Sequence, residues 1–274
     1  MSSQRDSLSH PEAAVGTHRV VPISGAPMIE LESEVTSRLV FLTDPGGLAA
    51  ERYKLLRRKI CSLSPQGGVV LVTSPAPADG KTLTSINLAF SLAEIAHPTC
   101  VVDLDFRAPG VLTTIGYHSE HPDMMDVLDG KSELPEAICQ LGGLPLYLLG
   151  MRSAARLPSF QLDRATVASV VLTLRAAFEW VILDLAPAIP FSDVPEVLPS
   201  ADGALMVLRA GKTKKSLIGP TVEVLGDKLW GVVFNDTVVS GGNYYGYYYR
   251  GGNAKARTGR ADEHNTLRGL SLRS

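Results

Sequence analysis

The sequence predicts an α/β protein with a doubly wound, mainly parallel sheet. Six short runs rich in Val, Ile and Leu lack the alternation of a half-solvated strand, as expected for strands covered on both faces. Segments with helical spacing lie between most of these runs, and this alternation indicates βαβ units. The 274 residues, 45% of them hydrophobic, suffice for a single domain with flexible ends.

The elements follow in order along the chain. Residues 1–36 are rich in Ser, Pro, Gly and Ala and lack apolar periodicity, which predicts a disordered N-terminal arm. Leucines and isoleucine at helical spacing, interleaved with Arg and Lys, predict a helix over about 48–63. The main domain is expected over 37–240, with the Gly-, Tyr- and Arg-rich residues 241–274 as a flexible tail. The expected strands span residues 68–74, 99–105, 144–150, 180–186, 203–210 and 230–236.

Composition excludes several classes of protein. The formal charge of −2 gives no reason to expect a nucleic-acid partner. No stretch approaches the roughly 20 apolar residues of a membrane helix, and the N-terminus lacks the apolar core of a signal peptide. Three widely spaced cysteines suggest reduced thiols, so we expect a cytoplasmic protein.

A candidate phosphate-binding loop follows the first long strand. Residues 74–82 read SPAPADGKT, and a helix begins near Leu83, so backbone N–H groups and the positive helix end would face phosphate oxygens. Lys81 would neutralise the β- and γ-phosphates and Thr82 would suit Mg²⁺. An ordinary turn is the alternative, because Pro75 replaces the usual first glycine. The predicted nucleotide-binding residues of this loop are Ala78, Asp79, Gly80, Lys81, Thr82 and Leu83.

Acidic residues end two other predicted strands. Asp103 and Asp105 close the run VVDLD, and Asp184 closes WVILD in the manner of a Walker B aspartate. Mg²⁺ requires hard oxygen ligands at fixed distance, and such aspartates supply them directly or through water. Helix capping explains one of them but hardly three beside a Gly-Lys-Thr. The pattern therefore predicts a nucleotide–Mg²⁺ site.

Five of the eight tyrosines cluster within six residues near the C-terminus. A strand is disfavoured because glycines flank the cluster and no polar residues alternate with the rings. A sticky low-complexity segment is the remaining simple interpretation. A chemical use of the hydroxyls explains the exposure of so many phenols better. The cluster consists of Tyr244, Tyr245, Tyr247, Tyr248 and Tyr249.

With these motifs the chain resembles the bacterial tyrosine kinases that control capsule and exopolysaccharide export, which are related to partition-type P-loop ATPases. The resemblance runs from about residue 37 to residue 250. SPAPADGKT is similar to the family's Walker A motif, VVDLDFRAP to its second Asp-x-Asp-x-Arg box and VILDLAP to its Walker B motif. Glu51, Lys54 and Arg57 match the family's Glu-x-x-Arg-x-x-Arg oligomerisation motif, with Lys in place of one Arg.

The resemblance implies a P-loop NTPase fold and an ATP- and Mg²⁺-dependent autokinase that phosphorylates its own tyrosine cluster. It implies catalytic roles for Lys81, Asp103 and Asp105, with Asp103 activating the tyrosine hydroxyl. Thr82, Asp105 and Asp184 would hold Mg²⁺. Asn235 would contact the adenine.

The resemblance also implies partners. Members of the family form rings in which each tail enters the neighbouring active site, so we expect a homo-oligomer acting on protein substrates. A separate membrane polysaccharide co-polymerase would act as activator and recruit the chain to the inner face of the plasma membrane.

Two other functions remain open. A partition-type switch ATPase would carry a lysine early in its P-loop, where this chain has Ala76. A nucleotide-binding adaptor of the export machinery is the other alternative, and Pro75 keeps it open.

Overall fold

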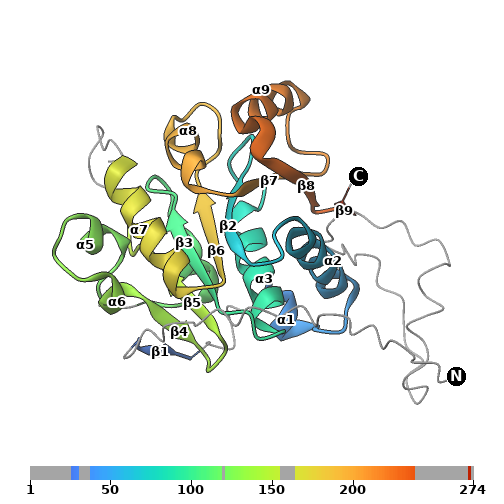
Figure 1. Cartoon of the computed structure of the whole chain (residues 1–274). Coiled ribbons are helices and arrows are strands. Elements are labelled where there is room, and N and C mark those ends of the chain that lie inside the picture. Colours follow the sequence, from blue (N-terminus) through green and yellow to red (C-terminus); the bar gives the residue numbers. More distant parts are fainter. Residues whose placement is uncertain (1–25, 31–37, 119–120, 155–163, 238–270, 273–274) are drawn as a thin grey trace, which may run out of the picture.

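The computed structural model describes residues 26–30, 38–118, 121–154, 164–237 and 271–272 (Figure 1). Within these residues one nine-stranded sheet forms, in the order β1-β4-β5-β3-β6-β2-β7-β8-β9. Helices cover both of its faces (Figure 1), so the predicted doubly wound α/β fold is confirmed. The strands are β1 Met28–Ile29, β2 Gly68–Thr73, β3 Thr99–Leu104, β4 Cys139–Leu141, β5 Leu146–Leu149, β6 Trp180–Leu185, β7 Gly203–Arg209, β8 Leu229–Asn235 and β9 Ser271–Leu272.

The helices alternate with the strands as the spacing predicts. The expected helix over 48–63 is α2, and the two other long amphipathic segments form α3 and α7. Short helices that the sequence did not predict join the remaining strands. The helices are α1 Val40–Thr43, α2 Leu48–Leu63, α3 Lys81–Ala93, α4 Val111–Ile115, α5 Met124–Leu128, α6 Leu134–Ala137, α7 Arg164–Ala177, α8 Asp193–Val197 and α9 Lys215–Leu225, with short 3₁₀ turns at Leu198–Ser200 and Gly226–Lys228.

The central strands β3, β6, β2, β7 and β8 all run parallel. The register of β6 aligns Asp184 with Val72 of β2 on one side and with Asp103 of β3 on the other. Parallel strands end at the same edge of a sheet, which is where ligands bind in open α/β folds. The register therefore brings the loop after β2 beside both acidic strand ends.

Alternate residues of the central strands face two separate cores. Val70 and Val72 of β2 pack with residues of α2 and α3, whereas Val69 and Leu71 pack with residues of α7 and α8. Strands β2, β3 and β6 are buried along their whole length. Burial on both faces explains why their sequences are continuously apolar.

Helix α3 lies between the sheet and α2, so nearly all of its side chains are buried, polar ones included. Figure 1 shows α2 lying on the outer side of α3, which carries the phosphate-binding loop at its N-terminus. A buried, doubly covered helix is a rigid support for a binding site.

The chain departs from the sequence-based expectation at both ends. Residues 28 and 29 lie in the arm predicted as disordered, yet they form β1, which pairs with β4, and Ile29 is buried. Residues 271–272, in the predicted flexible tail, pair with β8 as β9. The antiparallel pairing of β4 with β5 was also unexpected. A two-residue strand carries too little periodicity to be detected from sequence.

Candidate active site

The loop between β2 and α3 has the backbone geometry of a phosphate-binding turn. Gly80 adopts φ +98°, and a Cβ atom there would lie 1.8 Å from the side-chain nitrogen of Asn235. Only glycine fits that position, because both the left-handed backbone and the close approach exclude a side chain. Ala78 also has positive φ, at +62°, although it is not glycine. Pro75 therefore replaces the first glycine of the motif without removing the turn at its end.

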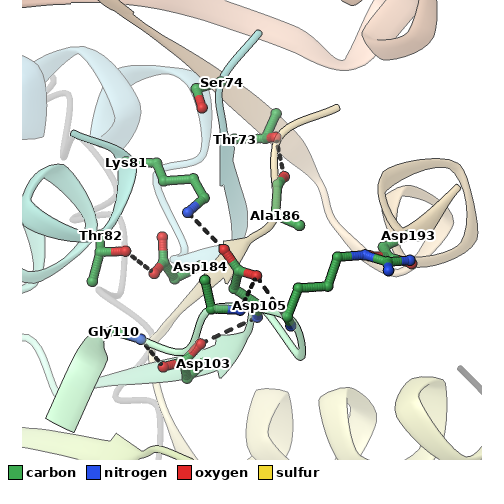
Figure 2. A network of polar contacts seen from close by, with 12 residues as sticks. Thr73, Ser74, Lys81, Thr82, Asp103, Asp105, Gly110, Asp184, Ala186 and Asp193 are labelled. Atoms are coloured by element: carbon green, nitrogen blue, oxygen red, sulfur yellow. Dashed lines mark hydrogen bonds and ion pairs between the residues drawn. The ribbon is translucent and has the colours of Figure 1, made fainter. Parts of the chain in front are cut away.

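Lys81 and Thr82, the first residues of α3, point toward the two acidic strand ends (Figure 2). The Nζ atom of Lys81 lies 2.7 Å from Oδ2 of Asp105. The hydroxyl of Thr82 donates a 2.6 Å hydrogen bond to Oδ2 of Asp184. Ser85, one turn later, donates to Oδ1 of Asp184 over 3.1 Å. Loop, β3 and β6 thus converge in one polar network, as the sequence predicts for Lys81, Thr82, Asp105 and Asp184.

Asp103 has a different environment from the other two aspartates. Its side chain is fully buried, and its Oδ2 accepts hydrogen bonds from the backbone N–H groups of Gly110 and Val111, each 2.9 Å long. Its Oδ1 accepts another from the N–H of Asp105 over 3.1 Å. These contacts fold the chain after β3 back onto the strand end (Figure 2). In this geometry Asp103 shapes the loop, and its predicted role as activator of a tyrosine hydroxyl stays a prediction.

Burial dominates the electrostatics of the network. Burial raises the pKa of Asp184 well above its ordinary value, against the lowering effects of Lys81 and of the Thr82 and Ser85 hydroxyls. Burial, and then the neighbouring Asp184 carboxylate, raises the pKa of Asp103. Burial lowers the pKa of Lys81, but the surrounding carboxylates raise it by more, so the ammonium stays charged. Three buried carboxylates therefore share one buried ammonium.

Three further hydrogen bonds brace the predicted phosphate loop. Asp79 accepts hydrogen bonds from the N–H of Ala76, 3.1 Å, and from the hydroxyl of Thr213 after β7, 2.8 Å. Asn235, at the end of β8, donates to the carbonyl of Asp79 over 3.0 Å. Asp79 and Asn235 thus lie at the predicted site, as supports of the loop. The sequence analysis missed Thr213 and Ser85, which are ordinary hydroxyl residues without a distinguishing spacing.

A hollow of about 340 Å³ opens beside the loop. That volume is within the range of small-ligand sites. Several predicted nucleotide-binding residues line it, together with four residues that were not predicted for the site. The predicted ones are Ala78, Gly80, Lys81, Thr82, Leu83 and Asn235. The additional ones are Arg38, Thr114, Arg209 and Asp236.

The residues at this edge fit a nucleotide and Mg²⁺. Mg²⁺ is usually held by one or two carboxylates plus phosphate and water oxygens, and Thr82, Asp105 and Asp184 supply such a partial set. In the part of the chain that the structure describes, no three His, Cys, Asp or Glu side chains form a complete metal cage by themselves. That arrangement suits an ion shared with phosphates.

A second charged contact lies at the outer side of the network. The guanidinium carbon of Arg107 lies 4.2 Å from the ring centroid of Phe191, and Nε of Arg107 lies 3.4 Å from Oδ2 of Asp193. These contacts join the segment after β3 to the segment after β6.

The three residues of the predicted oligomerisation motif lie on α2. Lys54 contacts Glu51 at 3.0 Å and Glu94, just after α3, at 3.6 Å. Arg57 is buried, contacts Glu94 at 3.1 Å and donates to the carbonyl of Ser91. Lys54 and Arg57 therefore bind α2 to α3 within one chain, and a role in subunit contacts stays a prediction.

The five clustered tyrosines lie outside the described residues, so their role as phosphate acceptors also stays a prediction. Among the helices that are described, none has the length and apolar character of a membrane-spanning segment.

Comparison with known proteins supports the resemblance drawn from the motifs. No family model matches the chain. It is 28% identical over 221 residues to the tyrosine-protein kinase YwqD of Bacillus subtilis. The matched stretch covers 79% of this chain and 93% of YwqD. The tyrosine-protein kinase CpsD of Streptococcus pneumoniae is 27% identical, over 73% of this chain and 90% of CpsD. The succinoglycan biosynthesis transport protein ExoP of Rhizobium meliloti is 30% identical, over 62% of this chain but 22% of ExoP.

Solved structures confirm the fold. The chimerical protein CapA2B2 matches with a TM-score of 0.67 and 22% identity, over 77% of this chain and 94% of that one. The kinase domain of the Escherichia coli tyrosine kinase ETK matches with a TM-score of 0.66 and 22% identity, over 76% of this chain and 83% of the ETK chain. The septum site-determining protein MinD of Pyrococcus horikoshii, complexed with Mg-ADP, matches with a TM-score of 0.53 and 20% identity, over 61% of this chain and 70% of the MinD chain. The P-loop NTPase type of fold is therefore confirmed.

Proposed function

We propose that this chain, a relative of bacterial tyrosine-protein kinases, is itself an ATP- and Mg²⁺-dependent protein-tyrosine kinase. The observation that carries the proposal is the convergence of Lys81, Thr82, Asp105 and Asp184 in one buried network beside the left-handed Gly80. A structural neighbour with the same fold is complexed with Mg-ADP. The curated relatives that the chain covers almost completely are named tyrosine-protein kinases.

The chemistry would rest on positioning and charge neutralisation. The backbone amides of the loop, the N-terminus of α3 and Lys81 would bind the triphosphate. Thr82, Asp105 and Asp184 would hold Mg²⁺, which supplies neutralisation of the phosphate charge. The phenol oxygen would bond to the γ-phosphorus while the bond to the β–γ bridging oxygen breaks, so that ADP leaves and the phenol proton passes to the carboxylate of Asp103. Because such transition states are loose, the fold mainly has to align the two oxygens.

Asp103 remains the predicted residue that orients the tyrosine hydroxyl. Its hydrogen bonds to the N–H groups of Asp105, Gly110 and Val111 give it a second task, since they set the position of Asp105. Loss of the Asp103 carboxylate would thus disturb the metal-binding side of the site as well as the acceptor.

The acceptors we propose are the tyrosines at 244, 245, 247, 248 and 249, phosphorylated by a neighbouring subunit in a ring. Each phosphotyrosine adds roughly −1.5 to −2 charge. A modified cluster would be repelled by a site that already holds three buried carboxylates, which would release the tail and weaken the ring. Helix α2 would form the subunit contact.

We further propose that this cycle regulates capsular or exopolysaccharide synthesis and export. ExoP, a succinoglycan biosynthesis transport protein, contains a stretch similar to this chain within a much longer polypeptide. A polysaccharide co-polymerase in the membrane would then act as activator and hold the kinase at the inner face of the plasma membrane.

Mass spectrometry of the purified chain incubated with ATP and Mg²⁺ tests the kinase directly. We expect phosphate on the tyrosines of the cluster, and none in Lys81→Ala. Lys131→Ala is the matched control, because Lys131 is an exposed lysine that pairs with Asp129 after α5 and is not among the residues that line the hollow. Bound ATP without phosphotyrosine, even with an activator segment present, would favour the adaptor or the switch ATPase.

A mixing experiment tests transfer between subunits. One chain keeps its site but has all five clustered tyrosines replaced by Phe, and the other is Lys81→Ala with its tyrosines intact. Phosphate on the Lys81→Ala chain, rising with protein concentration, is the expected result. If the Lys81→Ala chain stays unmodified in the mixture, while the unsubstituted chain incubated separately is phosphorylated, transfer occurs within one subunit.

A further inference from the structure

Arg38 lines the same hollow as the phosphate loop, although it precedes that loop by about 40 residues. It lies just before α1. The sequence offers no motif at this position. Any role of Arg38 at this hollow rests on the proposed nucleotide site.

A buried asparagine holds Arg38 at this place. Asn87 of α3 is fully buried, and its side chain donates to the carbonyl of Arg38 over 3.3 Å and accepts from the N–H of Val40 over 2.9 Å. The same amide group donates to the carbonyl of Leu83 over 2.9 Å. Leu39, between the two clamped groups, is also fully buried. The backbone of Arg38 is thereby attached to the helix that begins at the phosphate loop.

The side chain of Arg38 is exposed and differs from the other cations of this region. Lys81 is paired with Asp105, Arg209 with Asp236 and Arg107 with Asp193. Among the described residues, no hydrogen bond or ion pair involves the guanidinium of Arg38. A fixed backbone thus presents an arginine without an ion-pair partner among these residues at the wall of the hollow, where the one lining carboxylate, that of Asp236, is paired with Arg209.

We infer that Arg38 is a nucleotide-positioning residue that binds phosphate oxygens of the bound ATP. Guanidinium groups bind phosphates through parallel N–H donors, which fixes orientation as well as charge. Because Arg38 belongs to the segment before α1, it would add a cation to the hollow from a part of the chain separate from the phosphate loop and from Arg209. The Asn87 clamp would keep this contact aligned with α3.

Binding of nucleotides to Arg38→Gln, measured calorimetrically with Mg²⁺ present, tests the inference. We expect affinity for ATP and ADP to fall about tenfold, as for a charge-assisted hydrogen bond, and affinity for adenosine to stay unchanged. Arg38→Lys should recover part of the loss because it keeps the charge. Arg164→Gln is the control, since Arg164 is an exposed arginine on α7, at the other face of the sheet.

Each outcome separates the inference from the proposed function. If Arg38→Gln binds ATP as tightly as the unsubstituted chain, while Lys81→Ala binds it poorly, the inference is wrong and the nucleotide site stands. An equal loss for adenosine and ATP would also overturn it, because the contact would then involve the nucleoside. If the unsubstituted chain binds no ATP, the proposed function and this inference fall together.

Discussion

The two edges of the central sheet use charge in opposite ways. At the carboxyl edge Asp103, Asp105 and Asp184 are all at most 2% exposed and share one buried ammonium, that of Lys81. At the amino edge charges occur in half-exposed pairs. Asp202, before β7, binds Arg175 at 2.9 Å and the N–H of Val69 at 2.8 Å.

The amino-edge contacts connect neighbouring elements. The Asp202 carboxylate has a cation, Arg175, and a backbone donor, the N–H of Val69. A second contact joins Nδ1 of His97 to the carboxylate of Glu179 over 2.5 Å. Such contacts contribute modestly to stability because water still screens them.

The carboxyl edge is unbalanced. Burial disfavours the charged form of a carboxyl group unless a cation compensates it, and burial is the main cause of the raised pKa values of Asp103 and Asp184. A protein can retain an excess of buried acidic side chains over basic ones at a site where a bound cation and phosphates complete the set of charges. The contrast therefore separates residues that connect elements of the fold from residues that we propose to bind ligands.

The largest effect is expected from Asp184→Asn. The amide can still bond to the Thr82 and Ser85 hydroxyls, but it no longer offers a charged ligand to Mg²⁺. We expect tyrosine phosphorylation to fall on the order of 10³-fold, by analogy with the loss of a preorganised electrostatic group. The unfolding free energy should not fall, because one buried like charge is removed. A strongly destabilised yet active variant would contradict the contrast between the edges.

The next effect is stabilisation by ligand. ATP with Mg²⁺ at about 100 times its dissociation constant should raise the unfolding free energy by about 2.7 kcal/mol. Thermal unfolding with ATP, with Mg²⁺ and with both together measures the gain. Mg²⁺ and ATP should act together more strongly than either alone, because the protein supplies only part of the ion's ligands. If the stabilisation by ATP and Mg²⁺ together equalled the sum of the two separate stabilisations, the ion would bind away from the phosphates.

A smaller effect concerns pH. The folded chain raises the pKa of Asp103 and Asp184, so above the ordinary aspartate value near 4 it binds more protons than the unfolded chain. With a metal chelator present and nucleotide absent, the unfolding free energy should therefore rise as the pH falls from about 8 toward about 5. The rise should be up to about 1.4 kcal/mol per pH unit for each extra proton that the folded chain binds. Chemical denaturation at each pH measures it. In Asp184→Asn the slope should shrink, and an unchanged slope would assign it to other groups.

The sequence predicted the groups at the carboxyl edge better than the supports around them. Strand ends carrying aspartates and a Gly-Lys-Thr are local patterns, and parallel pairing brings them together without further information. The Asn87 clamp, the Thr213–Asp79 contact and the position of Arg38 depend on distant segments meeting. Asn, Thr and Arg occur throughout the chain, so no spacing distinguishes these three.

The same limit applies to α2. Its helical period was evident, and both ends were predicted correctly. Its charged residues were predicted to contact another subunit, which stays a prediction, and the sequence did not predict that Arg57 is buried and pairs with Glu94 just after α3. A sequence shows that a charge lies on a helix, whereas its partner depends on which helix packs there.

The smallest effect is expected from Asp202→Asn, the amino-edge counterpart of Asp184→Asn. The amide oxygen can still accept from the N–H of Val69, but the ion pair with the half-exposed Arg175 is lost. Exposed pairs contribute about 0.2–1 kcal/mol, so we expect an unfolding free energy lower by less than about 1 kcal/mol. Phosphorylation and ATP binding should equal those of the unsubstituted chain. The same chemical change would thus remove activity at one edge and only a little stability at the other. If Asp202→Asn reduced phosphorylation as strongly as Asp184→Asn, burial and charge imbalance would not identify the ligand-binding edge.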